Sequence, residues 1–255
     1  MPESIVLTYA ALFGLSIGSF LNVCILRLPK GGSILRPRSS CPSCKRQLSW
    51  YENVPVVSYL VLRGRCRTCG TRISILYPLV ELATALIWFG SFLYFDDRWQ
   101  ALSGAIFGTL LLGIAVTDAR EYIIPDEFSL GGLLLGLALS LAPGAPSPLM
   151  SVLGAAVSFA VMYAVAVIGE WAFKKPALGG GDIKMMAMVG AFLGPLYSLL
   201  TIFVGSAIGA VIFGPIGLKT GKLVPFGVFL ALGAAVVYVW GGDMVGWYAT
   251  RILGL

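Results

Sequence analysis

The chain has 255 residues, of which 58% are hydrophobic and only 12% are charged, and its mean hydropathy is +0.88. This balance excludes an ordinary soluble domain and is typical of a multi-pass membrane protein. The formal net charge of +6 is unevenly distributed, because segment 27–72 carries ten Lys and Arg residues against a single acid, Glu52.

Apolar runs recur along the whole chain, and a helix needs about 20 apolar residues to cross a bilayer. The runs predict eight spans, near 4–26, 76–95, 100–117, 127–142, 149–172, 183–194, 196–216 and 224–241. The run 183–194 is too short to cross easily as a straight helix, so we expect a broken or partial helix there. The first run lacks the basic flank of a cleavable signal and is too long for one, so we expect it to remain as a helix.

The expected fold is an all-α polytopic membrane protein with about eight transmembrane helices and a small cytoplasmic zinc-binding insertion. We expect three parts, a first transmembrane helix at 1–28, the insertion at 29–75 and a transmembrane core at 76–255. The positive-inside rule places the insertion in the cytoplasm and both termini outside it. All Lys and Arg residues except Arg98 and Arg251 then fall on the cytoplasmic side. Orientation and contact with lipid account for these cations, so no nucleic-acid partner is expected.

Two C-x-x-C turns lie in the insertion, Cys41 with Cys44 and Cys66 with Cys69, and segment 45–65 separates them. Such paired turns are typical of a four-thiolate zinc site, and the two turns with the segments after them form a weak internal repeat. A reducing cytoplasm disfavours the alternative of two disulfides. With four sulfur ligands the zinc has no open position, so we expect a structural ion. Cys24 lies in an apolar run and is expected to pack there.

The chain contains no histidine, which excludes Ser-His-Asp and Cys-His mechanisms and leaves carboxylates as the main groups for proton transfer. Two acids stand out at the ends of apolar runs. Asp118 closes one run, where the helix dipole disfavours an acid, and Asp182 opens another after Gly179, Gly180 and Gly181. The three glycines would let an extended peptide approach Asp182, although a helix cap is the alternative for that residue.

Other acids have simpler interpretations. Asp126 follows Pro125 and is expected to be the N-cap of the fourth span. Glu81 lies inside the second span, where an acid is costly, so we expect it to face the bundle interior and to contact substrate or another helix.

Several motifs together resemble those of the bacterial type IV prepilin peptidases, in the same order along nearly the whole chain. They are Gly18-Ser19-Phe20-Leu21-Asn22-Val23 with Arg27-Leu28-Pro29, the two C-x-x-C turns with Trp50-Tyr51-Glu52-Asn53 between them, Tyr77-Pro78-x-x-Glu81, Asp118 with Ile124-Pro125-Asp126, and Gly179-Gly180-Gly181-Asp182-x-Lys184. The last of these resembles the G-x-G-D motif of that family.

The resemblance implies an aspartic endopeptidase of the bacterial inner membrane, with Asp118 and Asp182 as the catalytic acids. Family members remove the leader from type IV prepilins and from type II secretion pseudopilins on the cytoplasmic side. Many then methylate the new N-terminus with S-adenosylmethionine, an activity associated with the cysteine loop. Supporting roles near the site are expected for Gly179, Gly180, Gly181, Lys184 and Glu81.

Methyl transfer needs groups that hold a sulfonium, for which aromatic faces and carboxylates are suited. The candidates are Trp50, Tyr51, Glu52 and Asn53, whose alternative role is packing around the zinc site. Two other functions stay open at this point: a transporter with Asp118 and Asp182 as a carboxylate relay, and a peptidase of the same mechanism with other substrates and no methyl transfer.

Overall fold

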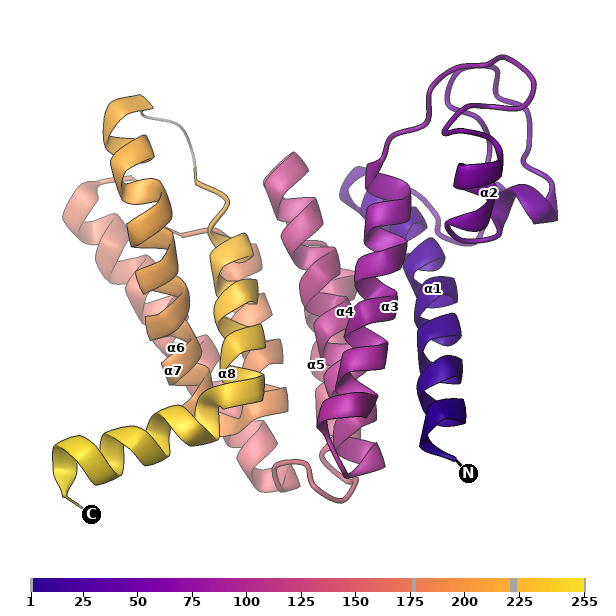
Figure 1. Cartoon of the computed structure of the whole chain (residues 1–255). Helices are drawn as coiled ribbons and strands as arrows, with labels where there is room; N and C mark the ends of the chain where they lie inside the picture. The colour runs from indigo at the N-terminus through magenta and orange to yellow at the C-terminus, as the bar shows by residue number, and fades with distance from the viewer. Residues whose placement is uncertain (1, 176–177, 221–223, 255) are drawn as a thin grey trace. The chain divides into compact units, whose positions relative to one another are not determined.

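The computed structural model describes residues 2–175, 178–220 and 224–254, apart from the side chains of 214–220. The described chain is built from helices, and its only β-pairing is two isolated bridges in the insertion (Figure 1). The long helices are α1 (Glu3–Arg27), α3 (Leu76–Tyr94), α4 (Arg98–Glu121), α5 (Asp126–Leu139), α6 (Pro148–Phe173), α7 (Gly180–Thr220) and α8 (Phe226–Tyr248). The short ones are η1 (Leu28–Lys30), η2 (Trp50–Asn53), α2 (Val57–Val61) and η3 (Ala249–Leu253). The predicted all-α membrane fold is confirmed.

The predicted count of eight spans is not confirmed. Within the described residues, six helices are long and apolar enough to cross a membrane, namely α1, α3, α4, α6, α7 and α8. Helix α5 has 14 residues and therefore a length of about 21 Å, less than the hydrocarbon core of a bilayer. Helix α7 covers both the sixth and the seventh predicted spans, and the break between them is the non-helical Gly194 (φ 75°, ψ 178°). Only glycine adopts this conformation readily.

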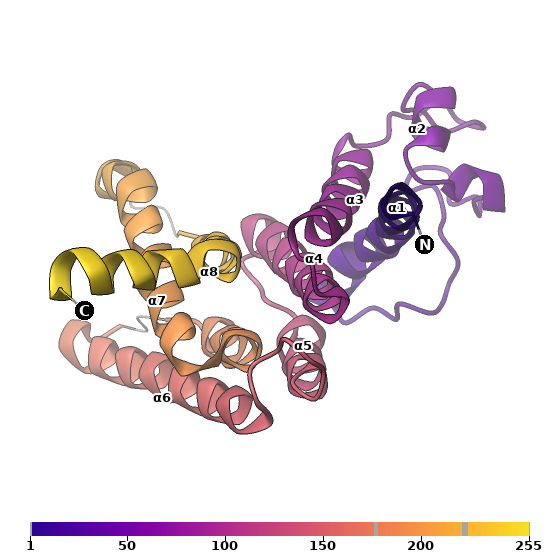
Figure 2. The ribbon, with the colours of Figure 1, turned by 60° about the horizontal axis from the view of Figure 1, so that its bottom comes forward.

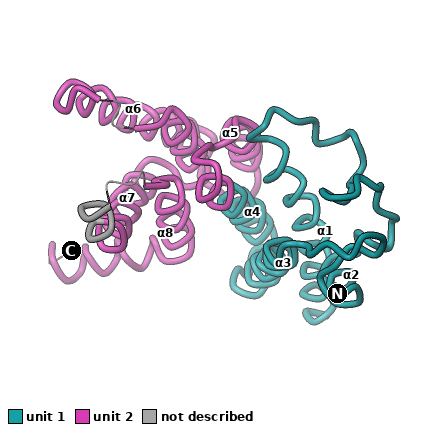
Figure 3. Tube along the Cα trace, turned by 90° about the horizontal axis from the view of Figure 1, so that it is seen from above, with its two compact units in different colours: residues 1–113 teal, residues 114–255 magenta. Residues whose placement is uncertain are grey.

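The chain divides into two compact units, residues 1–113 and residues 114–255 (Figure 3). The division falls inside α4, so neither unit corresponds to one of the three parts expected from the sequence, and that three-part division stays a prediction. Unit 1 contains the insertion with its cysteines, and unit 2 contains both Asp118 and Asp182.

In unit 1 the helices α1 and α3 pack closely because glycines face the crossing. A Cβ at Gly14 would lie 2.8 Å from the Ala85 Cα, and one at Gly18 would lie 2.7 Å from the Glu81 Cα. Asn22 of α1 adds a polar contact, since its side-chain amide donates to the Tyr77 carbonyl at 3.0 Å. Small residues thus bring the backbone of α1 next to the buried acid of α3.

In unit 2 the helix α7 is central and packs against α5, α6 and α8 (Figure 2). Its crossing with α6 is a backbone contact, because a Cβ at Gly154 would overlap the Gly190 carbonyl and lie 2.7 Å from the Gly194 Cα. The crossing with α8 is similar, with Gly233 against Gly205. This packing positions the first turn of α7, which carries Asp182, and the first turn of α8, which contacts Asp118.

Candidate functional site

The four predicted zinc ligands come together in unit 1. The sulfur atoms of Cys41, Cys44, Cys66 and Cys69 all lie within 4.8 Å of one another, and the Sγ atoms of Cys41 and Cys69 are 3.7 Å apart. Around a tetrahedral zinc with bonds of about 2.3 Å, the sulfurs would be about 3.8 Å apart. All of these cysteines are free, so the structure contains a thiol cluster in place of the alternative disulfides.

The two C-x-x-C turns have the same backbone structure, which explains the internal repeat in the sequence. In the first turn the Cys41 N–H donates to the Arg46 carbonyl and the Lys45 N–H donates to the Cys41 carbonyl. The second turn repeats both bonds at the equivalent positions, with Cys66 bonded to Thr71 and Gly70 bonded to Cys66. The residue after each turn has positive φ, 58° at Lys45 and 68° at Gly70. Each turn thus presents two sulfurs toward the other.

The electrostatics of the cluster fit a bound dication. Hydrogen bonds with the side chain and backbone of Thr71 lower the pKa of the Cys69 thiol to about 6. At Cys44 the backbone of Arg46 favours the thiolate, but desolvation and the three neighbouring thiols outweigh it and raise the pKa to about 11. Four neighbouring thiolates therefore repel one another in the absence of a metal ion. A divalent ion that binds all four compensates their negative charge.

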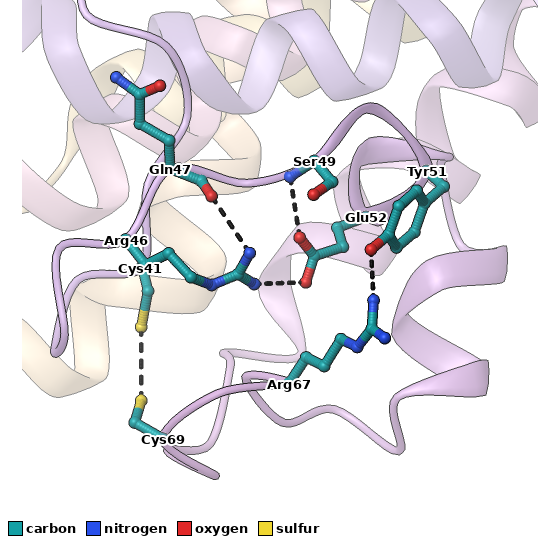
Figure 4. A network of polar contacts seen from close by, with 8 residues as sticks. All are labelled: Cys41, Arg46, Gln47, Ser49, Tyr51, Glu52, Arg67 and Cys69. Atoms are coloured by element: carbon teal, nitrogen blue, oxygen red, sulfur yellow. Dashed lines mark hydrogen bonds and ion pairs between the residues drawn. The ribbon is translucent and has the colours of Figure 1, made fainter.

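A salt bridge supports the first turn (Figure 4). The Arg46 Nη2 lies 2.6 Å from the Glu52 Oε1, and the other Glu52 oxygen accepts from the Ser49 N–H at 2.8 Å as part of a capping box at η2. The Arg46 guanidinium and then the Ser49 N–H hold the pKa of Glu52 below its usual range. Glu52 is therefore a buried, ionised and fully engaged carboxylate.

The four methyl-transfer candidates do not share one environment. Trp50 is 76% exposed, and Tyr51 is exposed and accepts a hydrogen bond from Arg67, whose guanidinium also lies over the Tyr51 ring (Figure 4). Glu52 and Asn53 line a cavity of unit 1, and Trp50 and Tyr51 are not among its lining residues. Glu52 and Asn53 thus contribute to the cavity wall, whereas the aromatic residues Trp50 and Tyr51 do not.

Asp118 lies near the end of α4, and it is 6% exposed. Its carboxylate accepts a hydrogen bond from the Val228 N–H at 3.2 Å, in the first turn of α8. The N-terminal N–H groups of a helix have no partner within the helix, and the helix dipole favours an anion there. The first turn of α8 therefore supplies the compensation that an acid at the end of α4 requires.

Asp182 lies in the first turn of α7 and interacts electrostatically with Asp118. The helix begins at Gly180, so Asp182 is inside it and is not its N-cap. The Asp182 N–H donates to the Gly179 carbonyl at 3.2 Å, and a Cβ at Gly179 would lie 3.1 Å from an Asp182 carboxylate oxygen. The glycines before Asp182 therefore leave its carboxylate accessible.

Ile124 joins the two acid-bearing regions within unit 2. A Cβ at Gly181 would lie 3.0 Å from the Ile124 Cβ, and a Cβ at Gly227 would lie 2.8 Å from the Ile124 Cδ1 and 2.9 Å from the Asp118 Oδ2. The start of α7, the start of α8 and the segment after α4 thus meet at one apolar side chain. The Gly181 and Gly227 positions have no room for a larger residue.

Lys184 binds Asp126 through both carboxylate oxygens, at 2.8 and 2.9 Å. The expectation that Asp126 is an N-cap is wrong, because α5 has Pro125 at that position and Asp126 is its first residue. The Asp126 carboxylate instead ties the start of α5 to the first turn of α7. The Lys184 side chain is 40% exposed in this ion pair. The pair holds the first turn of α7, next to Asp182, in place.

Glu81 is buried in unit 1, as expected of an acid within a span, and is 8% exposed. One of its oxygens accepts from the Val56 N–H at 2.7 Å. Its contact is therefore with the insertion and with α1, and it lies in a different unit from Asp118 and Asp182.

Sequence reasoning overlooked Gly227 and Val228, for which the only signal was a glycine after Pro225 at the start of an apolar run.

Two family models match the chain. The bacterial peptidase A24 N-terminal domain matches residues 12–95, and the type IV leader peptidase family matches residues 105–214. The chain is 41% identical to a protein of Myxococcus xanthus over 83% of this chain, and the match spans 63% of that relative's length. It is 34% identical to a protein of Aeromonas hydrophila, with 95% of this chain and 93% of the relative covered. A protein of Bacillus subtilis is also 34% identical, with 95% and 98% covered.

All three relatives carry the name prepilin leader peptidase/N-methyltransferase. No solved structure is significantly similar to this chain.

Proposed function

Because the chain belongs to the type IV leader peptidase family, we propose that it is a membrane aspartic endopeptidase that removes prepilin leaders and then methylates the new N-terminus. The observation that carries the peptidase activity is that Asp118 and Asp182 lie in one unit, where the start of α7 and the start of α8, which binds Asp118, meet at Ile124. A relay for ions is not favoured, since the relatives that cover most of this chain are peptidases by name.

In the proposed mechanism one carboxyl of the pair is protonated and the other is ionised, as is usual for two acids that share a site. The ionised acid takes a proton from water, which attacks the scissile carbonyl, while the protonated acid donates a hydrogen bond to the carbonyl oxygen. The proton then passes to the leaving amine. The Val228 N–H keeps one Asp118 oxygen oriented through these steps.

The residues around the pair have positioning roles in this proposal. Gly179 and Gly180 leave room for an extended peptide beside Asp182, and Gly181 packs on Ile124. Lys184 holds the first turn of α7 through Asp126. Small residues permit the close backbone approach that an extended substrate needs. Glu81 does not belong to this group, and its role lies in unit 1.

The cluster of Cys41, Cys44, Cys66 and Cys69 would hold a structural zinc ion, which supplies folding energy to a segment too small to build its own core. We assign the insertion to the cytoplasm and both termini to the other side of the inner membrane, from the basic residues of 27–72. Prepilins and type II pseudopilins would enter from the bilayer, with their basic leaders on the cytoplasmic side. S-adenosylmethionine would be the methyl donor.

Separate Asp118→Asn and Asp182→Asn variants test the catalytic pair. Each is expected to lower leader cleavage of a prepilin by more than about a thousandfold, since a paired acid and base is lost. Methylation of a synthetic peptide that already has the mature N-terminus is expected to continue, which shows that the variant is folded. Asp243→Asn, which changes an acid of α8 outside the catalytic pair, serves as the matched control. Cleavage at the normal rate by either variant would remove that residue from the mechanism.

The alternative of a carboxylate relay is tested with the purified protein in detergent, where no ion gradient exists. Cleavage there requires a peptidase. Mass spectrometry of the product N-terminus then reports both the position of the cut and the added methyl group.

A further inference from the structure

Unit 1 contains a cavity of about 290 Å³ between α1, α3 and the insertion. Its polar lining comes from side chains distant in sequence: the acids Glu52 and Glu81, the cations Arg27 and Arg67, and neutral groups such as Asn22, Asn53 and Tyr59. The other lining residues include Leu48, Leu62 and Ile73, so apolar walls surround a few polar groups. Sites for small molecules have this composition and are about this large or larger.

The two acids of the cavity differ in how their charge is balanced. Glu52 forms a salt bridge with Arg46. Glu81 accepts hydrogen bonds from the Val56 N–H and the Ser19 side chain, but in the part of the chain that the structure describes no cationic group lies within 4.0 Å of it. A buried carboxylate without a positive partner is costly. A cationic ligand in the cavity would balance it.

The backbone next to Glu81 is strained. Val56 has φ 59° and ψ −48°, a conformation that a β-branched residue rarely adopts. Its N–H is the group that Glu81 accepts from, so this hydrogen bond fixes the carboxylate and the strained turn together. Strain of this kind gathers at ligand sites, where the surrounding structure maintains it.

We propose that this cavity binds the methyl donor and that Glu81 is the counter-charge of the donor's sulfonium. The inference rests on the methyl-transfer part of the proposed function. S-adenosylmethionine carries a cationic sulfur beside a purine and a ribose, which suits an unbalanced acid among apolar walls and carboxamides. The Tyr59 ring, which packs on Gly64, provides an aromatic face to the same cavity.

The zinc cluster forms part of the wall, because Cys41 and Cys66 line the cavity. A four-thiolate zinc centre would have a net charge of −2, and together with Glu52 and Glu81 it would outweigh the two arginines of the lining, Arg27 and Arg67. The insertion thus contributes both the metal site and part of the donor site. This arrangement gives a physical reason for an association between the cysteine loop and methyl transfer.

Direct binding tests the proposal with three ligands that differ in charge at one position. S-adenosylmethionine has a sulfonium there, sinefungin has an amine that is protonated, and S-adenosylhomocysteine has a neutral thioether. Affinities of the full chain in detergent are measured by isothermal titration calorimetry. For Glu81→Gln we expect about tenfold weaker binding of the two cations and a change of less than about twofold for S-adenosylhomocysteine.

Glutamine keeps an acceptor for the Val56 N–H and the Ser19 hydroxyl, so Glu81→Gln is expected to fold, and retained leader cleavage verifies this. Glu3→Gln, at an exposed acid of the same unit, should bind all three ligands as the unchanged chain does. Ser58→Phe, which fills the cavity, should weaken all three alike and leave cleavage intact.

Equal weakening of the three ligands by Glu81→Gln, or no weakening at all, would overturn the role of Glu81. Tight binding to Ser58→Phe would overturn the location. If the unchanged chain binds the donor and methylates, and both variants do so normally, the cavity proposal is refuted. The proposed methyltransferase function would still hold in that case. A chain that cleaves but neither binds donor nor methylates would refute the methyl-transfer function, and the cavity proposal with it.

Discussion

The Asp118 carboxylate accepts a hydrogen bond from the Val228 N–H at 3.2 Å, which joins the end of α4 to the first turn of α8. An acid at the C-terminal end of its own helix is disfavoured by the dipole of that helix. Here the N-terminal turn of a second helix compensates it. Asp118 is therefore held in one orientation by a backbone group, which side-chain substitutions in α8 do not remove.

Gly227→Ala is the substitution that tests this orientation. The new Cβ would lie 2.9 Å from the Asp118 Oδ2 and 2.8 Å from the Ile124 Cδ1, so the carboxylate must move. We expect kcat/KM for leader cleavage to fall at least about tenfold, because small displacements of reacting groups are costly. Gly242→Ala on the same helix is the matched control, since no atom lies within 4 Å of its Cβ position. Equal activity of the two variants would contradict the role of this contact.

The membrane class, the helical runs and the cysteine cluster follow from local sequence. Hydropathy alone marks each apolar run, and the spacing within each C-x-x-C turn determines how two sulfurs converge. The repeat that relates Cys41 to Cys66 extends to the backbone hydrogen bonds of both turns. Such features depend on residues that are close in sequence, so periodicity and spacing reveal them.

Contacts between distant segments could not be predicted in this way. The partner of Asp118 is a backbone N–H 110 residues away, and the partner of Lys184 is Asp126, 58 residues away. The neighbours of Asp126 suit a helix cap, but a tertiary ion pair uses its carboxylate instead. The break at Gly194, by contrast, falls where the sequence separates the predicted runs 183–194 and 196–216.

The ion pair of Lys184 with Asp126 is expected to position Asp182. Its side chains are 40% and 54% exposed, so the pair itself should stabilise the fold by only about 0.2–1 kcal/mol. Lys184→Met and Asp126→Asn should each lower kcat for cleavage about two- to tenfold, by the same factor, and the double variant should be no worse than either. Glu127→Gln, at the neighbouring exposed acid, is the control. A rise in KM confined to Lys184→Met would show instead that Lys184 contacts the substrate.

The crossing of α6 and α7 is expected to be sensitive to a single methyl group. A Cβ at Gly190 would overlap the Gly154 backbone and lie 2.7 Å from the Ser158 Oγ, so Gly190→Ala must push the two helices apart. We expect a loss of about 1–3 kcal/mol and a lower unfolding temperature in detergent. Gly131→Ala, whose Cβ position in α5 has no atom within 4 Å, should leave the temperature unchanged or raise it. Unfolding of Gly190→Ala at the temperature of the unchanged chain would refute the close contact.

Removal of zinc should separate the two activities. Cys41 and Cys66 line the cavity of unit 1, whereas Asp118 and Asp182 lie in unit 2. A chelator strong enough to strip a four-thiolate site is therefore expected to abolish methylation of a peptide with a mature N-terminus. Leader cleavage should change by less than about twofold, and added zinc should restore methylation.

The cysteine variants allow the same test without a chelator. Cys66→Ser should lose both the metal and methylation, while Cys24→Ser, at a buried cysteine of α1 outside the cluster, should keep both. Metal content is measured by inductively coupled plasma mass spectrometry on the same samples, because activity alone does not report occupancy. Methylation at the normal rate in a sample shown to lack metal would break the link. If the metal acts only on unit 1, cleavage should survive its loss. Loss of both activities together would therefore mean that the metal stabilises the fold of the whole chain.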